Sequence, residues 1–255
     1  MTTADGDYQD QRPLHERIAA DLRNEIMCGD LAPGASLPPT VRLTERFRAS
    51  NATVQKALRL LKDERLVIGR PGAAVTVREH RQETIRPAEF GSPAGPGEPY
   101  PWLTAAETRG RKGAIELLEV GERRPPADVA MTLGLTETGT AIMRSRLLTH
   151  DGEPVELATS YYPRELADGT AIAELRKIRG GTPALLAELG YPPRRTVDRV
   201  SARIPTQREC EALRLPGDLP VLRVLRVVYS DRERPIEVSV MAKAGHLYEL
   251  QYEFF

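Results

Sequence analysis

The segment from Leu14 to Val77 restricts the fold of this 255-residue chain more than any other. Ile18, Leu22 and Ile26 recur at helical spacing and form one apolar stripe. A helix is therefore predicted from about residue 13 to residue 28, and the glycine directly after it suits a left-handed C-terminal cap. A loop rich in Pro and Gly follows, so this helix is not expected to continue.

Two further helices and a hairpin are predicted in the same segment. A short helix is expected over Val41–Phe47, and Ser50 is a good N-cap for a third helix with its apolar residues on one face. Residues 67–77 place strand residues on either side of an Arg-Pro-Gly turn, which is typical of a small hairpin. Three short helices followed by a two-stranded wing form a winged helix-turn-helix, which places a helix in the major groove of DNA.

The charge distribution agrees with a nucleic-acid-binding head. The whole chain has 36 basic and 36 acidic residues, but residues 12–81 carry 13 Lys/Arg and 8 Asp/Glu, a net charge of +5. The rest of the chain therefore carries −5. A basic head joined to an acidic body is expected of a regulator, and a chance division of a mixed surface is the alternative.

Other features exclude several classes of protein. Residues 1–11 are polar and lack the apolar core of a signal peptide, and no apolar run reaches the roughly 18 residues that span a bilayer. Cys28 and Cys210 are isolated and lack metal-ligand spacing. We therefore expect a cytoplasmic protein with no membrane partner, no cofactor and no metal.

A change in composition predicts where the first domain ends. Residues 87–101 include five Pro and three Gly, so this stretch cannot build a core of its own. The predicted organisation is a DNA-binding domain over residues 12–80, a linker over residues 81–112, and an effector-binding and dimerisation domain over residues 113–255.

The body of the chain predicts an α+β domain around a mostly antiparallel sheet. Strand hairpins are expected at 141–162 and 221–241, a further strand at 195–204, and short helices at 127–133, 183–189 and 207–213. The stretches Val129–Ser160 and Cys210–Met241 share the order helix, Leu-x-Leu, turn and hairpin, which is a weak internal repeat.

The N-terminal pattern resembles the GntR superfamily of bacterial winged helix-turn-helix regulators over about 65 residues in register. The matching residues are Ile18, Leu22, Ile26, Gly29, Pro33-Gly34, Leu37-Pro38, Leu43, Phe47, Ser50, Thr53-Val54, Ala57-Leu58, Leu61 and Gly72. The resemblance implies that the starts of the second and third helices read bases, while a glycine at the wing tip enters the minor groove.

The body resembles the effector-sensing (UTRA) domain of the HutC subfamily, which implies a chorismate-lyase-like fold. The matching stretches are Pro126–Leu135, Arg144–Arg146, Asp151–Val155, Tyr162-Pro163, Leu185–Gly190 and Leu215–Arg223. This resemblance implies control by a small molecule. We expect a homodimer whose interface is supplied by the body, because the head is too small to supply both the DNA-binding and the dimer surfaces.

Carried over residue by residue, the resemblance identifies candidate DNA contacts. The residues carried over are Ser50, Asn51, Thr53, Gln55, Lys56 and Gly72. Thr40, which stands where the family has its base-reading motif, and Arg42, Arg48 and Arg70, which are candidates to replace cationic contacts usual in the family, complete the set. The family's usual Ser-Glu-Arg after Leu-Pro is absent here, and its usual Gly-Lys-Gly-Thr wing reads Gly-Ala-Ala-Val. We therefore expect an operator different from the usual family sequence and a modest salt dependence, since each lost phosphate contact removes roughly 0.9 from the log–log slope.

The candidate effector contacts are Arg144, Arg146, Thr182, Glu237 and Lys243. Arg144 and Arg146 alternate along one strand and so share a face, where they can form a two-pronged anion clamp or, alternatively, a surface salt-bridge pair. Glu237 and Lys243 can instead pair with each other. Because several sugar-binding positions of the family differ here, we do not expect an amino-sugar phosphate.

The predicted function is a sequence-specific transcriptional regulator that binds double-stranded DNA at a pseudo-palindromic operator. A repressor released by a small anionic effector and a constitutive repressor without one remain as alternatives. Catalysis is not expected, because nucleophile-elbow, zinc-protease and P-loop motifs are absent. Glu153 and Glu156 lie near a turn and are expected to be solvated.

Overall fold

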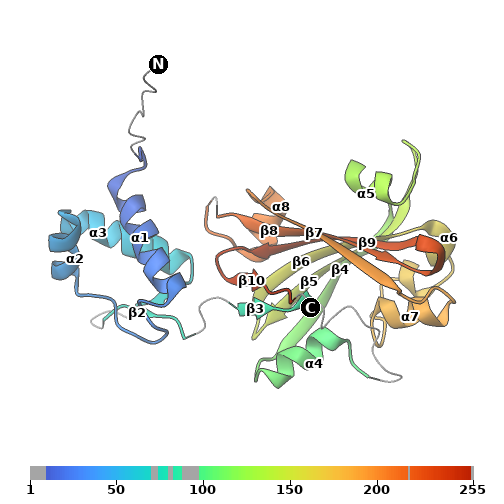
Figure 1. The fold of residues 1–255 in the computed structure, drawn as a ribbon, viewed down its shortest axis with the longest axis horizontal. Coiled ribbons are helices and arrows are strands. Elements are labelled where there is room, and N and C mark those ends of the chain that lie inside the picture. The colour runs from blue at the N-terminus through green and yellow to red at the C-terminus, as the bar shows by residue number, and fades with distance from the viewer. Residues whose placement is uncertain (1–9, 70–73, 80–82, 88–97, 218, 254–255) are drawn as a thin grey trace, which may run out of the picture. The chain divides into compact units, whose positions relative to one another are not determined.

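The computed structural model describes residues 10–69, 74–79, 83–87, 98–217 and 219–253. The chain forms two units, residues 1–83 and residues 84–255, and each is described by itself (Figure 1). The first unit holds three helices and a two-stranded wing. Its elements are α1 (Leu14–Cys28), α2 (Thr40–Phe47), α3 (Asn51–Asp63), β1 (Val67–Ile68) and β2 (Thr76–Val77).

The apolar stripes of these helices meet in one core, as the sequence predicts. The fully buried side chains are Ile18, Leu22, Ile26, Leu43, Val54, Ala57 and Leu61. An ion pair joins α1 to the end of α3, because Arg23 donates to both carboxylate oxygens of Glu64 at 2.7 and 2.5 Å. This bidentate contact and the core together hold α3 across α1.

The helix ends follow from local chemistry. Gly29 ends α1 with φ at 93°, a backbone conformation that favours glycine. Ser50 begins α3 by accepting a hydrogen bond from the backbone N–H of Thr53 at 3.2 Å. The wing strands β1 and β2 pair antiparallel, with Val67 opposite Val77. The turn residues 70–73, among them Arg70 and Gly72, lie outside the described residues.

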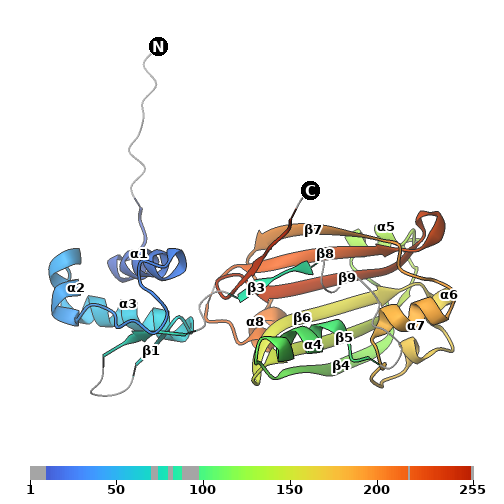
Figure 2. The same ribbon diagram turned by 60° about the horizontal axis from the view of Figure 1, so that its bottom comes forward.

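A six-stranded antiparallel sheet in the order β4-β5-β6-β9-β8-β7 forms the second unit (Figure 2). The strands are β4 (Gly113–Arg123), β5 (Ala141–His150), β6 (Glu153–Tyr162), β7 (Arg195–Arg203), β8 (Val221–Tyr229) and β9 (Pro235–Ala244). The α-helices in the described part of this unit are α4 (Pro101–Thr108), α5 (Ala127–Thr132), α6 (Arg164–Ala167), α7 (Thr182–Glu188) and α8 (Gln207–Leu213). The predicted α+β class with an antiparallel sheet is confirmed.

The sheet is built from two halves of like order, strand, helix and hairpin. The first half is β4-α5-β5-β6 and the second is β7-α8-β8-β9. They meet where β6 pairs with β9, and Ser160 lies opposite Ser239 at that seam. The internal repeat in the sequence matches the helix–hairpin part of each half, whereas the strand β4 was not predicted.

Helices cover both faces of this sheet. Val129 of α5 packs on one face against Leu225, Val227 and Val238, and Arg208 of α8 reaches Ser145 on this same face at 2.8 Å. The other face carries α6 and α7, and α4 lies on that side as well (Figure 2). Most of the polar side chains of the candidate effector site lie between this second face and the helices that cover it.

The segment predicted as a linker over residues 81–112 contains two elements. Strand β3 (Glu83–Ile85) pairs with β10 (Tyr248–Leu250), and α4 (Pro101–Thr108) packs on β4. Trp102 and Ala106 of α4 are buried against Gly113, where a Cβ atom would lie 2.9 Å from the Cβ of Ala106. These apolar contacts, which proline content does not reveal, attach the end of the segment to the second unit. Residues 81–82 and 88–97 lie outside the described residues.

Candidate functional site

One side of α3 is polar and open to solvent. Asn51, Gln55 and Lys56 are exposed, whereas the opposite side of the helix is buried in the core. Gln55 donates to the hydroxyl of Thr40 at 3.2 Å, which connects the exposed side of α3 to the start of α2. The amide and hydroxyl groups of the two helix starts therefore form one polar surface.

The N-cap residue of α3 has a structural role in addition to any contact with a ligand. The hydroxyls of Ser50 and Thr53 lie 2.8 Å apart, and Ser50 also caps the helix. Thr53 is half-buried, while Ser50 is exposed. The cap orients both hydroxyls at the exposed end of α3.

The cationic side chains of this surface differ in whether they already form a close ion pair. Arg42 lies 3.7 Å from the exposed carboxylate of Glu45, a loose contact, and Arg48 is exposed at the C-cap of α2. Arg46 instead forms a close ion pair with Glu25 of α1 and lies over the Phe47 ring. Arg42 and Arg48 thus remain available for a phosphate, and Arg46 does not.

The chemistry of this surface suits nucleic acid. Asn and Gln side chains can pair with the major-groove edge of adenine, and exposed cations and hydroxyls can contact phosphate oxygens. The structure places eight of the ten predicted DNA contacts on or beside α2 and α3. The other two, Arg70 and Gly72, lie outside the described residues.

The second unit has a cavity of about 490 Å³ over β4 and β5. The loop before α7 and residues 99–103 of the α4 segment complete its lining. Arg144, Arg146 and Thr182 line it, so three of the five predicted effector contacts come together here. Two exposed cations, Lys177 and Arg179, also line the cavity.

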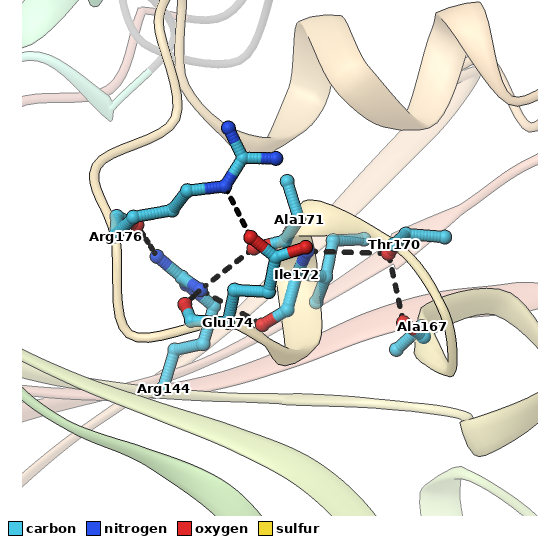
Figure 3. Close-up of polar contacts among 7 residues, drawn as sticks. All are labelled: Arg144, Ala167, Thr170, Ala171, Ile172, Glu174 and Arg176. Carbon is cyan, nitrogen blue, oxygen red and sulfur yellow. Dashed lines mark hydrogen bonds and ion pairs between the residues drawn. The ribbon is translucent and has the colours of Figure 1, made fainter.

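The guanidinium of Arg144 is hydrogen-bonded to the backbone of a neighbouring loop (Figure 3). It donates to the carbonyl oxygens of Ala171, Ile172, Glu174 and Arg176, at 3.2, 2.8, 2.9 and 2.8 Å. Arg144 is buried, and burial lowers its pKa. The two-pronged anion clamp stays a prediction, and the structure shows that Nη1 and Nη2 of Arg144 already hold the loop before α7.

Arg146 makes a single hydrogen bond to the described residues, from Nη2 to the Ser160 hydroxyl at 2.6 Å. Ser160 lies 2.6 Å from the Ser239 hydroxyl, and Ser239 donates to Glu237 at 2.6 Å. The Nε atom of Arg146 is buried without a partner. Within the described residues neither Arg144 nor Arg146 forms a salt bridge, so the alternative of a surface salt-bridge pair is wrong.

Thr182 lines the cavity, and the Tyr162 phenol is a buried polar group close to Arg146 and Glu237. Thr182 is buried at the start of α7, and Tyr162 is fully buried on β6. Burial raises the pKa of the Tyr162 phenol, and the nearby Glu237 carboxylate raises it further. The phenol therefore stays neutral at physiological pH.

Lys243 and Glu237 occupy different places. Lys243 forms a close, buried ion pair with Glu156 and lines a separate cavity of about 50 Å³. The alternative of a Glu237–Lys243 pair is therefore wrong. The expectation that Glu156 is solvated is wrong as well, because a bulge after Leu148 and the β6–β9 pairing bring Glu156 opposite Lys243. Glu237 joins Arg146 through the two serines instead.

Sequence reasoning missed several residues of this site. Tyr100, Leu103 and Lys177 line the cavity although the first two fall in the predicted linker. The serine pair that connects Arg146 to Glu237 was missed because its members lie on different hairpins. The period-2 pattern of β6 and β9 could have placed each serine on the same face as Arg146, but not opposite the other.

Comparison with known families decides the identity. Residues 108–249 match the UTRA domain, and residues 14–77 match the bacterial regulatory proteins of the gntR family. The chain belongs to the GntR family. The resemblance predicted from the sequence is confirmed, and the chain is a transcriptional regulator with a DNA-binding head and a UTRA domain.

Several relatives of this GntR-family regulator cover nearly its whole length. An uncharacterized HTH-type transcriptional regulator of Streptomyces coelicolor is 28% identical over 95% of this chain and 93% of its own. The Escherichia coli regulator GgaR is 26% identical over 94% and 90%. The HTH-type transcriptional repressor PhnF of Mycolicibacterium smegmatis is 26% identical over 88% and 85%.

A crystal structure supports the fold of this GntR-family chain. PhnF from Mycobacterium smegmatis superposes with a TM-score of 0.54 at 23% identity, over 93% of this chain and 100% of that one. The families and relatives are transcriptional regulators and not enzymes. None of the helices in the described residues is long and apolar enough to span a membrane.

Proposed function

We propose that this GntR-family regulator is a repressor that binds a pseudo-palindromic operator as a homodimer and is released by a small anion bound beside Arg146. The DNA-binding part rests on the exposed side of α3. Gln55 and Asn51 would read base edges there, Lys56 and Arg48 would contact phosphates, and Ser50 would keep the helix start in place. PhnF, which is named a repressor, supports the direction of control.

The anion-binding part rests on an imbalance of charge beneath the cavity. Lys243 is paired with Glu156, and Arg226 is paired with Asp198 at 2.7 Å. Glu237 is then the carboxylate that accompanies both Arg144 and Arg146. Among the described residues, one of these two cations therefore has no carboxylate of its own, which an anionic ligand would provide.

Arg146 is the group that such a ligand would meet. Four hydrogen bonds occupy Arg144, whereas Arg146 makes one bond to the described residues and lines the cavity. Its remaining N–H groups form a planar donor set that matches a carboxylate or phosphate. This difference between the two arginines is the observation that supports the proposal most.

Release from DNA would follow from linkage. A ligand that binds more tightly to the dimer form with low DNA affinity shifts the population by that differential affinity. Two heads must meet half-sites about one helical turn apart, so a change in their spacing would weaken binding to the operator. The chain between the head and the cavity, which ends in α4, would carry that change.

A constitutive repressor without an effector is the second candidate. It is favoured by the commitment of Arg144 to carbonyls and of Lys243 to Glu156, which removes two of the expected ligand contacts. A test separates the two candidates. DNA fragments are selected from a random pool by the full chain, and their affinity is measured by fluorescence anisotropy with and without millimolar organic phosphates and carboxylates.

The proposal predicts that at least one of these anions weakens the binding of selected DNA. The same anion should raise the thermal midpoint of the protein, since a ligand of the folded state stabilises it. Affinity and midpoint unchanged across the whole set would favour the constitutive repressor. DNA binding without any sequence preference would contradict both candidates.

A further inference from the structure

The 490 Å³ cavity is lined mainly by basic and apolar side chains. Among the described residues that line it, all charged side chains are basic, and none is a carboxylate or a carboxamide. Two of the basic residues, Lys177 and Arg179, are exposed, whereas Arg144 is buried. Most of the remaining lining is apolar, including Leu103, Ile115, Leu117 and Ile178.

Tyr100 forms an aromatic wall of this cavity. Its ring packs directly on the backbone of Gly181, where a Cβ atom would lie 2.6 Å from the Cδ2 atom of Tyr100. The next turn of the chain is equally close, because a Cβ at Gly113 would lie 3.0 Å from the Cζ3 atom of Trp102. The two glycines therefore let residues 100–106 sit tightly over the strands, and the Tyr100 ring is held in place.

Such a lining suits some anions much better than others. A sugar phosphate has many hydroxyl groups, and each buried hydroxyl needs a polar partner or costs free energy. Carboxylates accept hydrogen bonds from sugar hydroxyls and carboxamides accept and donate them, and neither group occurs in the part of the lining that the structure describes. An apolar ligand body gains from the same walls, because its transfer out of water is favourable.

We propose that the ligand of this cavity is an organic anion with an apolar body, whose carboxylate or phosphate binds Arg146 and whose alkyl or aryl part packs against Tyr100, Leu103 and Leu117. The inference rests on the proposed function, since it names the chemical class of the effector. Tyr100 is then the residue that determines specificity for the body of the ligand, and Arg146 the residue that binds its charge.

A matched set of probes tests this class by titration calorimetry with the full chain. Phenyl phosphate carries the charge and an apolar body, inorganic phosphate carries the charge alone, glucose 6-phosphate has a polar body, and phenol has no charge. Phenyl phosphate should bind about 10- to 100-fold more tightly than inorganic phosphate, the effect expected from burying one ring. The affinity for phenyl phosphate should exceed that for glucose 6-phosphate by a similar factor, and phenol should show no binding.

Variants of the wall make the test specific. Tyr100→Phe keeps the ring and should keep the preference for phenyl phosphate over inorganic phosphate, whereas Tyr100→Ala should reduce that preference about tenfold or more. Leu117→Asn provides a second wall variant in case Tyr100→Ala does not fold, and it should reduce the same ratio. Trp102, which packs beside Tyr100, offers a fluorescence signal for the same titrations.

The outcomes separate the ligand class from the proposed function. Binding of glucose 6-phosphate as tight as that of phenyl phosphate, and lost in Arg146→Ala, would overturn the apolar-body class and leave the anion-controlled regulator standing. A preference for phenyl phosphate that is the same in Tyr100→Ala and Leu117→Asn would also overturn it. Absence of binding by phenyl phosphate would overturn the apolar-body class, whereas the anion-controlled regulator would be overturned by unchanged DNA affinity across the wider set of organic phosphates and carboxylates.

Discussion

Arg146 donates a hydrogen bond to Ser160 at 2.6 Å across two neighbouring strands of the sheet. Ser160 is hydrogen-bonded to Ser239, and Ser239 donates to Glu237, at the seam between the two halves of the UTRA domain. The guanidinium is thereby oriented by a fixed chain of hydroxyls while most of its donors stay uncommitted. A group held in this way can bind an anion with little loss of side-chain entropy.

The first prediction concerns Arg146. In Arg146→Ala the affinity for an anion that binds the wild type should fall about 10- to 100-fold, because a hydrogen bond between charged groups contributes about 1.5–3 kcal/mol. Calorimetry measures the loss. The thermal midpoint without ligand should change little, since the side chain makes one hydrogen bond to the described residues. An unchanged anion affinity would rule out Arg146 as the binding group.

The second prediction concerns Arg144. Arg144→Ala removes the donor of four backbone carbonyls in residues 171–176, so the free energy of unfolding should fall by about 3 kcal/mol or more in urea denaturation. Arg164→Ala is a matched control, because Arg164 is exposed and its ion pairs should contribute about 0–1 kcal/mol. Equal stability losses in the two variants would show that Arg144 does not hold the loop.

The Lys243–Glu156 pair gives the third prediction. Loss of either partner leaves a buried charge, so Lys243→Met or Glu156→Leu alone should destabilise the protein by about 3–5 kcal/mol. The double variant should recover most of that loss, because neither charge is then buried. Anion affinity should be the same in the folded double variant and the wild type. A loss of anion affinity in the double variant would restore Lys243 as an effector contact.

The fold was largely predictable from the sequence because its signals are local. Ser50, Gly29 and the apolar spacing of Ile18, Leu22 and Ile26 mark the helices of the head, and turn residues mark both hairpins. Strand β4 and helix α4 were not predicted. The flat contact between them depends on Gly113 and Trp102, which are brought together by the fold and not by spacing in the sequence.

The site was predictable only in part, because its decisive contacts join segments that are far apart in the sequence. Strand alternation places Arg144 and Arg146 on one face, but it does not show that distant carbonyls occupy the first and leave the second available. The partner of Lys243 likewise follows from the β6–β9 register. Pairing between strands that are far apart in the chain is the information that the sequence pattern lacks.

The fourth prediction separates base reading from phosphate contact on α3. Gln55→Ala should reduce discrimination between selected and mutated DNA by about 1–3 kcal/mol, because a bidentate amide contact to a base is lost. Lys56→Ala should weaken binding to all DNA sequences alike and reduce the magnitude of the slope of log affinity against log salt by about 0.9. Anisotropy titrations at several salt concentrations measure both. Identical salt slopes in Lys56→Ala and wild type would exclude a phosphate contact there.

The fifth prediction concerns acid stability at α8. Burial alone would raise the pKa of Glu209, but hydrogen bonds from Arg203 and the backbone of Thr206 outweigh it and hold the pKa below its ordinary value of 4.5. A folded-state pKa below the unfolded value means that the carboxylate stabilises the fold above about pH 4.5 and loses this effect as the pH falls through the folded pKa. Glu209→Gln should therefore lower the thermal midpoint at pH 7 and lower it much less at pH 3. A difference that does not shrink in acid would contradict this assignment.

The central claim, that an anion at Arg146 controls the DNA-binding head, is tested most directly by one titration. Affinity for selected DNA is measured by anisotropy against increasing phenyl phosphate, for the wild type and for Arg146→Ala. The wild type should release the DNA as phenyl phosphate saturates the cavity, and Arg146→Ala should bind the same DNA and keep it. Equal release by both proteins, or phenyl phosphate that binds the wild type without changing its DNA affinity, would contradict the claim.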